Sequence, residues 1–381
     1  MEKCIYIVDG VRTAFGKMGG TLKDIYGCKL ASITIKGLLE KTEILNKAKV
    51  DCVMMGSAFH CALSSNPARW ASLDAGLGYE TSSSYVEMQC GSAIDSINHA
   101  AAKILIGQAD IIIAGGYESI RNRFAKFSMA TPPYKLIPPA AIPSQLSPVA
   151  EERIGMGLTA ENLAEQYRIS REEQDKYAYR SQMRCKEAME NGWLEEEIIS
   201  VQIPAIRKTP AYNFIKDEHP RPDTSTEGLS KLPAAFKKNG TVTAGNSSGL
   251  NDGAAFILLM TEKRATELGY SPYARWVTGG DIGCDLRVMG IALGFAVPIA
   301  LKRAGLKLKD LGVLECDEAF SAQNLAVMKE IKKQTNEELH GNLESTRRSD
   351  IIWASQRCFG RQDIHFCDET TGKKKSTLWY F

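Results

Sequence analysis

The chain has 381 residues, and 44% of them are hydrophobic, which is enough for a substantial core and more than one packing unit. Lysine and arginine total 47 against 45 acidic residues, so the net charge of +2 points to no particular partner. No clustered basic stripe precedes the last few dozen residues and no apolar run is long enough to cross a membrane, which argues against nucleic-acid and membrane partners.

Strand-like and helical patterns alternate along the first third of the chain. Apolar runs at 4–10, 50–55 and 111–114 read as strands, and the spacing of apolar residues predicts helices at 30–41 and 91–107. The first run opens the chain directly, without a leader-like segment, so a cytoplasmic location is expected. The alternation predicts an α/β fold with a mixed sheet covered on both faces.

Residues 119–245 break this rhythm and are interpreted as an inserted helical and loop subdomain. Prolines cluster near its start, and a polar helical stretch covers 159–191. A strand pattern returns at 254–260. Residues 299–320 then echo 35–59, because each has an amphipathic helix, a lysine-rich turn and an apolar strand before Ala-Phe. The echo favours two similar α/β halves.

Cys90 is the candidate nucleophile. It lies on a predicted strand-to-helix turn, where the partial positive charge of a helix N-terminus lowers a thiol pKa and backbone amides can hold an oxyanion. A buried structural cysteine is the alternative. The ten cysteines have neither metal-site spacing nor a disulfide framework, which predicts no metal site and suits a reducing compartment.

Several separated stretches, in the same order, resemble the thiolases, which make or cleave carbon–carbon bonds between acyl-CoA units. The stretches are VDGVRTAFGKMGGTLKD (8–24), NPAR (66–69), QCGSA (89–93), GQADIIIAGGYES (107–119), GMGLTAENLAEQY (155–167), AGNSSGLNDGAA (244–255) and DEAFSAQNLAV (317–327). Such a set is far more specific than one motif. The resemblance implies a thiolase-like fold of two βαβ halves with mixed sheets and an inserted subdomain.

The resemblance also implies roles for particular residues. Cys90 would carry the acyl group as a thioester in a ping-pong reaction. Met156 and Ser248 match positions that line the pantetheine channel, and Arg221 matches a basic residue near the CoA nucleotide. Without the motif context, Met156 would read as core, Ser248 as a turn residue and Arg221 as a solvated charge.

Ala319 and Phe320 match the acyl-pocket end of the family's Asn-Glu-Ala-Phe motif, but two nearby positions depart from the family pattern. Gly155 stands where many members have a histidine that contacts the acyl chain. Asp317 replaces the asparagine that helps to hold a water at an oxyanion site. An ionised carboxylate there opposes developing negative charge, so impaired turnover is expected.

The family's general base is a histidine in a Gly-His-Pro motif, and its second acid–base group is a cysteine in Cys-x-Gly-Gly-Gly. Neither motif is written in this chain. The five histidines are interpreted as surface or packing residues: His60, His99, His219, His340 and His365. The residue that deprotonates Cys90 is therefore not identified from the sequence.

The tail from 336 has no sustained period of 2 or 3.6 residues. When 347–363 is back-translated and read one nucleotide forward, the degenerate code permits Gly-Gly-Ala-Ile-x-Phe-Gly-His-Pro-Asn-Gly-Ala-Ser-Gly-Ala-Arg-Ile. The shifted reading contains the missing histidine motif. We interpret the tail as the product of a frameshift between 332 and 347, in the gene or in its reported sequence.

These observations predict an N-terminal thiolase half at 1–265, a truncated C-terminal half at 272–335 and an aberrant tail at 336–381. An acyltransferase that uses CoA as substrate and product, with no separate cofactor, is the first hypothesis. A non-catalytic CoA or acyl-thioester binding protein on the same fold is the alternative. A nicotinamide enzyme is discarded because the phosphate-binding glycine spacing is absent. By analogy, a homodimer or homotetramer is expected.

Overall fold

The computed structural model describes residues 4–128, 140–142, 144–205, 209–311, 314–337 and 356–357. The clustered prolines (Pro132, Pro133, Pro138, Pro139 and Pro143) and most of the predicted tail lie outside these ranges. Within them, no helix combines the length and apolar character needed to cross a membrane.

The centre of the molecule is a mixed sheet in the order β10-β1-β9-β5-β3-β4. Its strands are β1 (Ile5–Thr13), β3 (Cys52–Gly56), β4 (Ser82–Val86), β5 (Ile111–Glu118), β9 (Gly249–Thr261) and β10 (Ala274–Trp276). Strands β4, β3 and β5 are parallel, whereas the long central strand β9 is antiparallel to both β5 and β1. Short segments extend the sheet: β2 (Gly16–Lys17) and β11 (Gln356–Arg357) on β9, and β6 (Ile198–Ile199) on β1.

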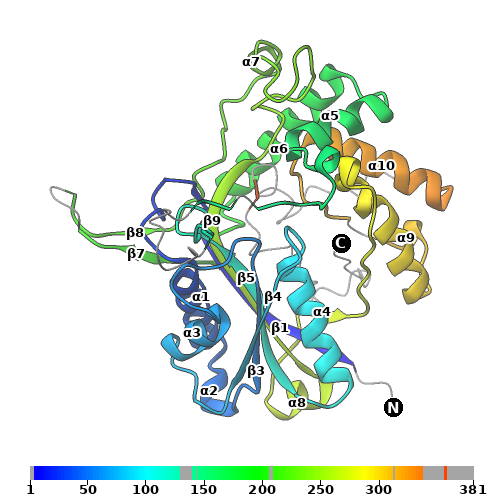
Figure 1. Ribbon diagram of the computed structural model, residues 1–381. Coiled ribbons are helices and arrows are strands. Elements are labelled where there is room, and N and C mark those ends of the chain that lie inside the picture. The colour runs from blue at the N-terminus through cyan, green and yellow to red at the C-terminus, as the bar shows by residue number, and fades with distance from the viewer. Residues whose placement is uncertain are drawn as a thin grey trace, which may run out of the picture.

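Helices cover both faces of the sheet, as expected (Figure 1). The helices of this half are α1 (Gly27–Thr42), α2 (Ile44–Lys47), α3 (Pro67–Asp74), α4 (Ser92–Leu105) and α8 (Glu262–Glu267). Successive side chains of a strand point to opposite faces, so Val53 and Met55 enter the core beneath α1, whereas Cys52 and Met54 enter the core beneath α4. Strands buried on both faces explain the continuous apolar runs in the sequence.

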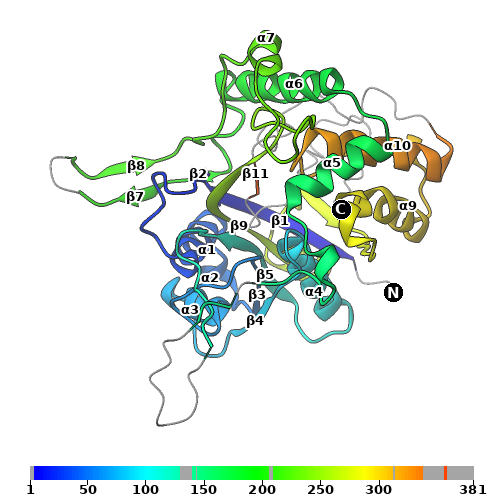
Figure 2. The same ribbon diagram turned by 45° about the horizontal axis from the view of Figure 1, so that its top comes forward.

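The inserted subdomain lies at one end of this sheet and consists mainly of helices (Figure 2). Its elements are a 3-10 turn at Ala150–Glu152, α5 (Met156–Gln166), α6 (Arg171–Glu190), α7 (Thr226–Ser230) and the projecting hairpin of β7 (Val201–Ile203) and β8 (Tyr212–Phe214). The single helical stretch predicted at 159–191 is two helices. The break occurs because Arg168 has a left-handed φ of 49° and Ser170 begins α6 with a capping box.

The described part of the second half is largely helical. It contains 3-10 turns at Leu286–Ile291 and Leu308–Asp310, and the helices α9 (Ala292–Ala304) and α10 (Ser321–Thr335). These helices share one core with α5. Of the strand predicted within 299–320 before the Ala-Phe pair, residues 312 and 313 lie outside the described residues, and 314–316 are not in a strand. A strand needs a hydrogen-bonded neighbour, and the equivalent β3 obtains its neighbours from β4 and β5, which follow it in the chain.

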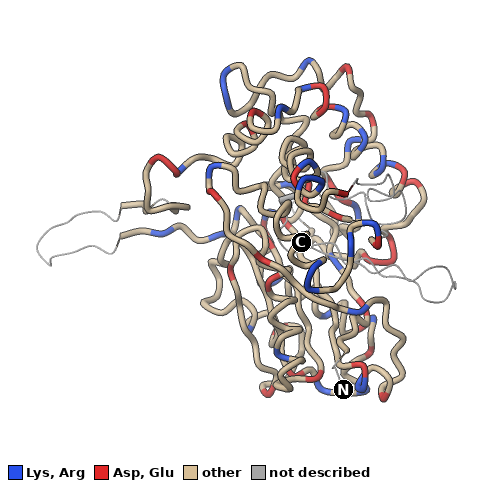
Figure 3. Tube along the Cα trace, turned by 90° about the vertical axis from the view of Figure 1, so that its right-hand side faces the viewer, with Lys and Arg blue, Asp and Glu red and all other residues tan. Residues whose placement is uncertain are grey.

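Charges of both signs are interspersed along the described trace (Figure 3). The sequence contains 47 basic and 45 acidic residues, and the two signs of charge are also mixed in space.

Candidate active site

The candidate site forms at one edge of the central sheet. Because β4, β3 and β5 are parallel, their carboxyl ends meet at the same edge. Strand β9 is antiparallel to them, and its first residues pair with the end of β5 through Glu118 and Gly253. The turn after β4 and the loop before β9 therefore lie at this edge, and they carry Cys90 and Ser248 respectively.

Cys90 lies in the tight turn between β4 and α4, as the sequence predicts, and is half-buried. Gln89 takes a left-handed φ of 48° immediately before it. The Ser92 hydroxyl accepts from the Met88 amide at 2.9 Å and donates to the Gln89 carbonyl at 2.6 Å, which closes the turn. Gly91, the N-cap residue of α4, provides no capping side chain, so the positive end of a 14-residue helix faces the Cys90 turn.

Two amides of this turn are used by the turn itself. The Gly91 amide donates to the Met88 carbonyl at 3.0 Å, and the Ser92 amide donates to the Gln89 carbonyl at 3.1 Å. The expectation that turn amides hold an oxyanion therefore fails for these two groups, because a turn this tight satisfies them internally. The favourable charge at Cys90 comes from the helix terminus instead.

Three predicted binding residues are brought together by a short backbone pairing. The Ser248 amide donates to the Ala319 carbonyl at 2.9 Å, and Ser247 forms a bridge with Phe320. The Ser321 amide donates to the Asn246 carbonyl at 3.0 Å. Two sequence motifs more than 60 residues apart therefore form one wall of the site.

Met156 contributes to the same wall from α5. It packs, half-buried, against the cluster that contains Phe320. The ring of Phe236, which the sequence analysis missed, lies edge-on to the Phe320 ring at 5.9 Å and remains 42% exposed. A Cβ at Gly157 would lie 2.1 Å from the Phe236 ring, so this glycine lets the ring approach α5. An exposed aromatic ring beside Met156 is suited to an apolar ligand chain.

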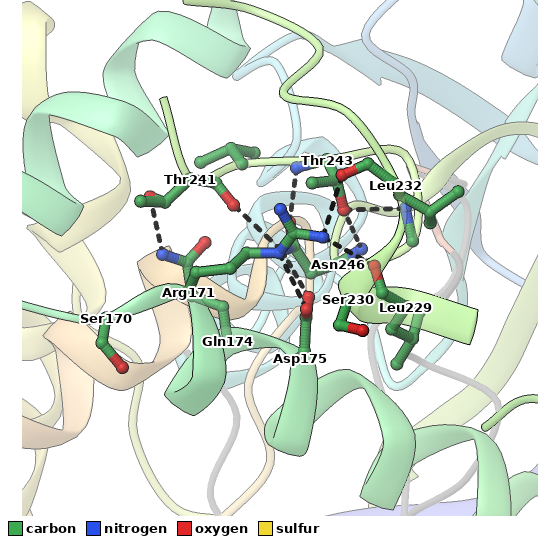
Figure 4. A network of polar contacts seen from close by, with 12 residues as sticks. Ser170, Arg171, Gln174, Asp175, Leu229, Ser230, Leu232, Thr241, Thr243 and Asn246 are labelled. Carbon is green, nitrogen blue, oxygen red and sulfur yellow. Dashed lines mark hydrogen bonds and ion pairs between the residues drawn. The ribbon is translucent and has the colours of Figure 1, made fainter. Parts of the chain in front are cut away.

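Helix α6 holds the Ser248 loop through a polar network (Figure 4). The Arg171 guanidinium binds Asp175 at 2.8 Å and donates to the Leu229 and Leu232 carbonyls. The other Asp175 oxygen accepts from the Asn246 side chain at 2.9 Å. Asn246 is 2% exposed and directly precedes the two serines of the wall.

The same helix holds the second motif. Tyr177 donates to Glu318 at 2.7 Å and Ser181 donates to its other oxygen at 2.5 Å. Burial raises the pKa of Glu318, and these two hydrogen bonds oppose that shift. Tyr177 and Ser181 are four residues apart and so lie on one helix face, a spacing that the sequence displays but that did not reveal their partner.

Asp317 and Arg221 are less closely tied to the wall. Asp317 is half-buried, and its backbone carbonyl accepts from the Asn324 side chain at 3.2 Å. Arg221 is exposed on a loop beside α6, where its amide donates to the Gln182 side chain at 2.8 Å. Among the described residues, neither the Arg221 amide nor the Ser248 amide bonds to the other residue.

The three histidines within the described ranges each have contacts of their own. His60 packs edge-on against the rings of Tyr85 and Phe124, at 5.1 and 5.2 Å. His99 is exposed on α4 beside Asp95. His219 packs against Gly249, and burial lowers its pKa. His340 and His365 lie outside the described residues.

Comparisons with known proteins identify the family of the chain. The family model for the thiolase N-terminal domain matches residues 5–263, and that for the thiolase C-terminal domain matches 270–342. A probable acetyl-CoA acyltransferase of Staphylococcus aureus (strain COL) is 40% identical over 335 residues, covering 86% of this chain and 84% of the relative. Residues 343–381 lie beyond the family match.

Solved structures extend the likeness to the fold. An acetyl-CoA acetyltransferase from Syntrophomonas wolfei is 33% identical with a TM-score of 0.82, over 90% of this chain and 86% of that one. Human mitochondrial 3-ketoacyl-CoA thiolase in complex with CoA is 33% identical with a TM-score of 0.80, over 94% and 88%. The chain therefore belongs to the thiolase family of acyltransferases, with acyl transfer and carbon–carbon bond chemistry between acyl-CoA substrates as its class of reaction.

Proposed function

We propose that Cys90 carries the acyl group of this reaction as a thioester. Its sulfur attacks the thioester carbonyl of one acyl-CoA, and the CoA thiolate leaves. A second acyl-CoA, deprotonated at the carbon next to its carbonyl, then attacks the Cys90 thioester and releases the cysteine, and the reverse sequence cleaves the bond. The observation that carries this proposal is the position of Cys90 at the N-terminus of α4, on the sheet edge that it shares with the Ser248 loop.

The wall formed where the Ser248 loop pairs with the Ala319 segment is proposed to bind the CoA thioester. Met156, Ser248, Ala319 and Phe320 would contact the pantetheine and acyl groups, and Phe236 would extend this surface. Support comes from their contacts in the structure and from the CoA complex of the human relative. Arg221, exposed at the far side of the loop, would face the CoA nucleotide, where a cation favours phosphate.

Two features are proposed to impair turnover of this chain. Asp317 brings a carboxylate to a position where negative charge develops. The Gly-His-Pro and Cys-x-Gly-Gly-Gly motifs are absent from the written sequence, so the proton of Cys90 and that of the second acyl-CoA lack their usual acceptors. The absence of those motifs also keeps the alternative, a CoA-binding protein without turnover, as a second candidate.

Thiolysis of acetoacetyl-CoA, together with CoA binding by calorimetry, separates the two candidates. An acyltransferase acylates Cys90 and shows at least slow thiolysis, and Cys90→Ala abolishes both while leaving CoA binding within about twofold. A binding protein gives equal CoA affinity in both forms and no acyl group on Cys90. The second pattern would reject the proposed intermediate.

We also propose that the chain forms a homodimer through β4. Within the described residues this strand pairs only with β3, so its outer edge is open, and the Ser83 hydroxyl has no hydrogen-bond partner. A second copy can pair with this edge about a two-fold axis. Ser84→Lys opposes like charges across that axis and should give monomers in sedimentation, whereas Ser230→Lys on exposed α7 should not. A monomeric parent chain would contradict the proposal, and a tetramer would add a second interface.

The proposed reaction uses CoA as substrate and product and assigns no step to a separate cofactor. A cytoplasmic location and a role in fatty-acid metabolism belong to the same proposal, and the bacterial relative supports them.

A further inference from the structure

Two cysteines away from the candidate site form a close buried pair. Cys28 is the second residue of α1, and Cys61 lies in the loop between β3 and α3. Their sulfur atoms are 3.3 Å apart within hydrogen-bond distance, and both are free thiols. Cys28 is 0% exposed and Cys61 is 4% exposed. Both lie in the core beneath α1, whereas α4 covers the opposite face.

The surroundings of Cys61 favour a thiolate. The hydrogen bond between the Cys28 and Cys61 sulfurs is the largest influence that lowers the pKa of Cys61, and backbone hydrogen bonds from Cys28, Leu63 and Ser64 add to it. These donors lower the pKa of Cys61, although burial opposes them. The pKa of Cys28 is raised by its hydrogen bond to Cys61 and by burial. These directions favour Cys61 as the more acidic thiol of the pair, and its sulfur lies 3.3 Å from that of Cys28 at the start of a 16-residue helix.

A single side chain fixes the two cysteines relative to each other. The Tyr117 hydroxyl accepts from the Cys61 amide at 3.2 Å. The ring of the same tyrosine packs against the start of α1, where a Cβ at Gly27 would lie 2.1 Å from it. The helix start and the loop are thus both anchored on β5. A disulfide has an S–S length of about 2.05 Å, so the sulfurs need to approach by only about 1.3 Å.

We propose that Cys61 and Cys28 form a reversible oxidation site for peroxide, with Cys61 as the attacking thiol and Cys28 as the resolving thiol. The Cys61 thiolate attacks one oxygen of hydrogen peroxide, the O–O bond breaks, and the products are a Cys61 sulfenic acid and hydroxide. The Cys28 sulfur then attacks the Cys61 sulfur, the S–O bond breaks, and water leaves. Overall, two thiols lose two protons and two electrons, and one peroxide becomes two waters.

Burial makes this site selective for small oxidants. Hydrogen peroxide is close to water in size, whereas an acyl-CoA cannot reach a sulfur that is 4% exposed. The site is therefore separate from acylation at Cys90 and does not depend on the proposed function.

The test uses the full chain carrying Cys90→Ser, fully reduced and freed of reductant, with its fold checked by circular dichroism. One equivalent of hydrogen peroxide is added at pH 7, and the chain is then denatured, alkylated and mapped by mass spectrometry. We expect a peptide that joins Cys28 to Cys61, a loss of two alkylatable thiols, and full reversal by dithiothreitol. A bridge that forms only after denaturation, or no bridge, would overturn the proposal.

Three variants in the same background assign the roles. Cys52→Ser removes a buried cysteine on the opposite face of β3 and should leave the bridge unchanged. Cys28→Ser should leave a Cys61 sulfenic acid that dimedone traps. Cys61→Ser should slow oxidation of Cys28 by at least about tenfold, because the thiolate is gone. Undiminished oxidation of Cys28 in Cys61→Ser would reject Cys61 as the attacking thiol, whatever the other variants do.

Discussion

Cys90 lies at the N-terminus of α4, and Cys61 lies in a loop with its sulfur beside Cys28 at the start of α1, but the exposure of the two cysteines differs. Cys90 is half-buried in a turn at the sheet edge, whereas Cys61 is closed off beneath α1. The size of the reagent, in addition to thiol acidity, therefore decides which cysteine reacts. This distinction changes how a labelling experiment is read, since a small alkylating reagent can report Cys61 as well as Cys90.

Brief exposure of the folded chain to acetyl-CoA should place an acetyl group on Cys90 in preference to the other cysteines. The charge at the start of α4 favours the thiolate, and the open turn admits the thioester. Peptide mapping measures the modification. Cys90→Ser should reduce acetylation to background, and Cys61→Ser should leave it unchanged. Acetyl-CoA labelling of Cys61 with Cys90 untouched would contradict the assignment.

Asp252 makes stability depend on pH. It is fully buried, one carboxylate oxygen accepts from the Ile120 amide at 2.7 Å, and the other has no hydrogen-bond partner among the residues that the structure describes. Burial raises its pKa to about 6, and the Glu218 carboxylate adds to this shift by disfavouring the ionised form. The folded state therefore keeps a proton that the unfolded state has lost, and the free energy of unfolding falls as pH rises from about 4 to about 6.

Asp252→Asn should remove this dependence. The variant should exceed the parent by about 2–3 kcal/mol in free energy of unfolding at pH 7 and differ little near pH 4. Urea unfolding at both pH values measures the difference, with Asp24→Asn as an exposed control. Equal free energies of unfolding of parent and variant at pH 7 would mean that ionising the buried Asp252 carboxylate does not destabilise the folded state.

At the scale of elements, α6 is the part that holds the binding wall. One turn of it anchors Asn246 through Asp175, and the next turns anchor Glu318 through Tyr177 and Ser181. Two loops from distant parts of the sequence are thereby attached to one rigid helix. Because Ser248 follows Asn246, and Ala319 follows Glu318, the helix sets the relative position of both loops.

Asp175→Ala should destabilise the fold and detach the Ser248 loop. The carboxylate is nearly buried and pairs with both Arg171 and Asn246, so its removal leaves two donors unsatisfied and should cost about 2–3 kcal/mol. Urea unfolding measures the loss. The matched control is Glu227→Ala, which breaks an exposed pair with Lys231 and should stay within about 0.5 kcal/mol. If both variants lost a similar free energy of unfolding, the polar network around Asp175 would not stabilise the fold more than an exposed ion pair does.

At the scale of the whole molecule, the central question is the reading frame of the tail. The family match stops at residue 342, and the stretch whose shifted reading contains Gly-His-Pro begins at residue 347. If the frameshift is real, Ala354 must be encoded by GCA, Ser355 by TCC and Gln356 by CAA, and the shifted frame should continue into Cys-x-Gly-Gly-Gly. Sequencing the coding DNA checks this, and any other codon at Ala354 would reject it because no histidine could result.

Restoring the frame should recover both solubility and activity. An acid–base group contributes about 10²–10⁴-fold, so a chain that lacks two should show almost no carbon–carbon bond formation. The strands expected in the missing segment would also complete the second half, and an incomplete half invites association with other chains. Soluble yield and acetoacetyl-CoA thiolysis by both forms measure the recovery. Comparable turnover from the written chain would show that another residue acts as base.

The sequence by itself determined the features that depend only on residues close together in the chain, namely individual helices, strands and turns. The apolar periods predicted α4 and the strands β3 and β5, which the structure confirms, because a period of 3.6 or 2 places one face of a local segment in the core. Cys90 was located by the same local logic, as the residue between a strand and a helix.

Only the tertiary structure decided which distant segments of the chain contact each other, because these contacts depend on the order of the strands in the sheet. Three contacts join segments that are far apart in the sequence and that no local period relates. They are the hydrogen bond between Ser248 and Ala319, the hydrogen bond from α6 to Glu318 and the contact between Cys28 and Cys61. The strand expected within 299–320 shows the converse. Its apolar residues satisfy the local pattern, but a strand is stable only when another strand supplies its hydrogen bonds. Residues 314–316, the last part of that pattern before the Ala-Phe motif, pair with no strand among the described residues.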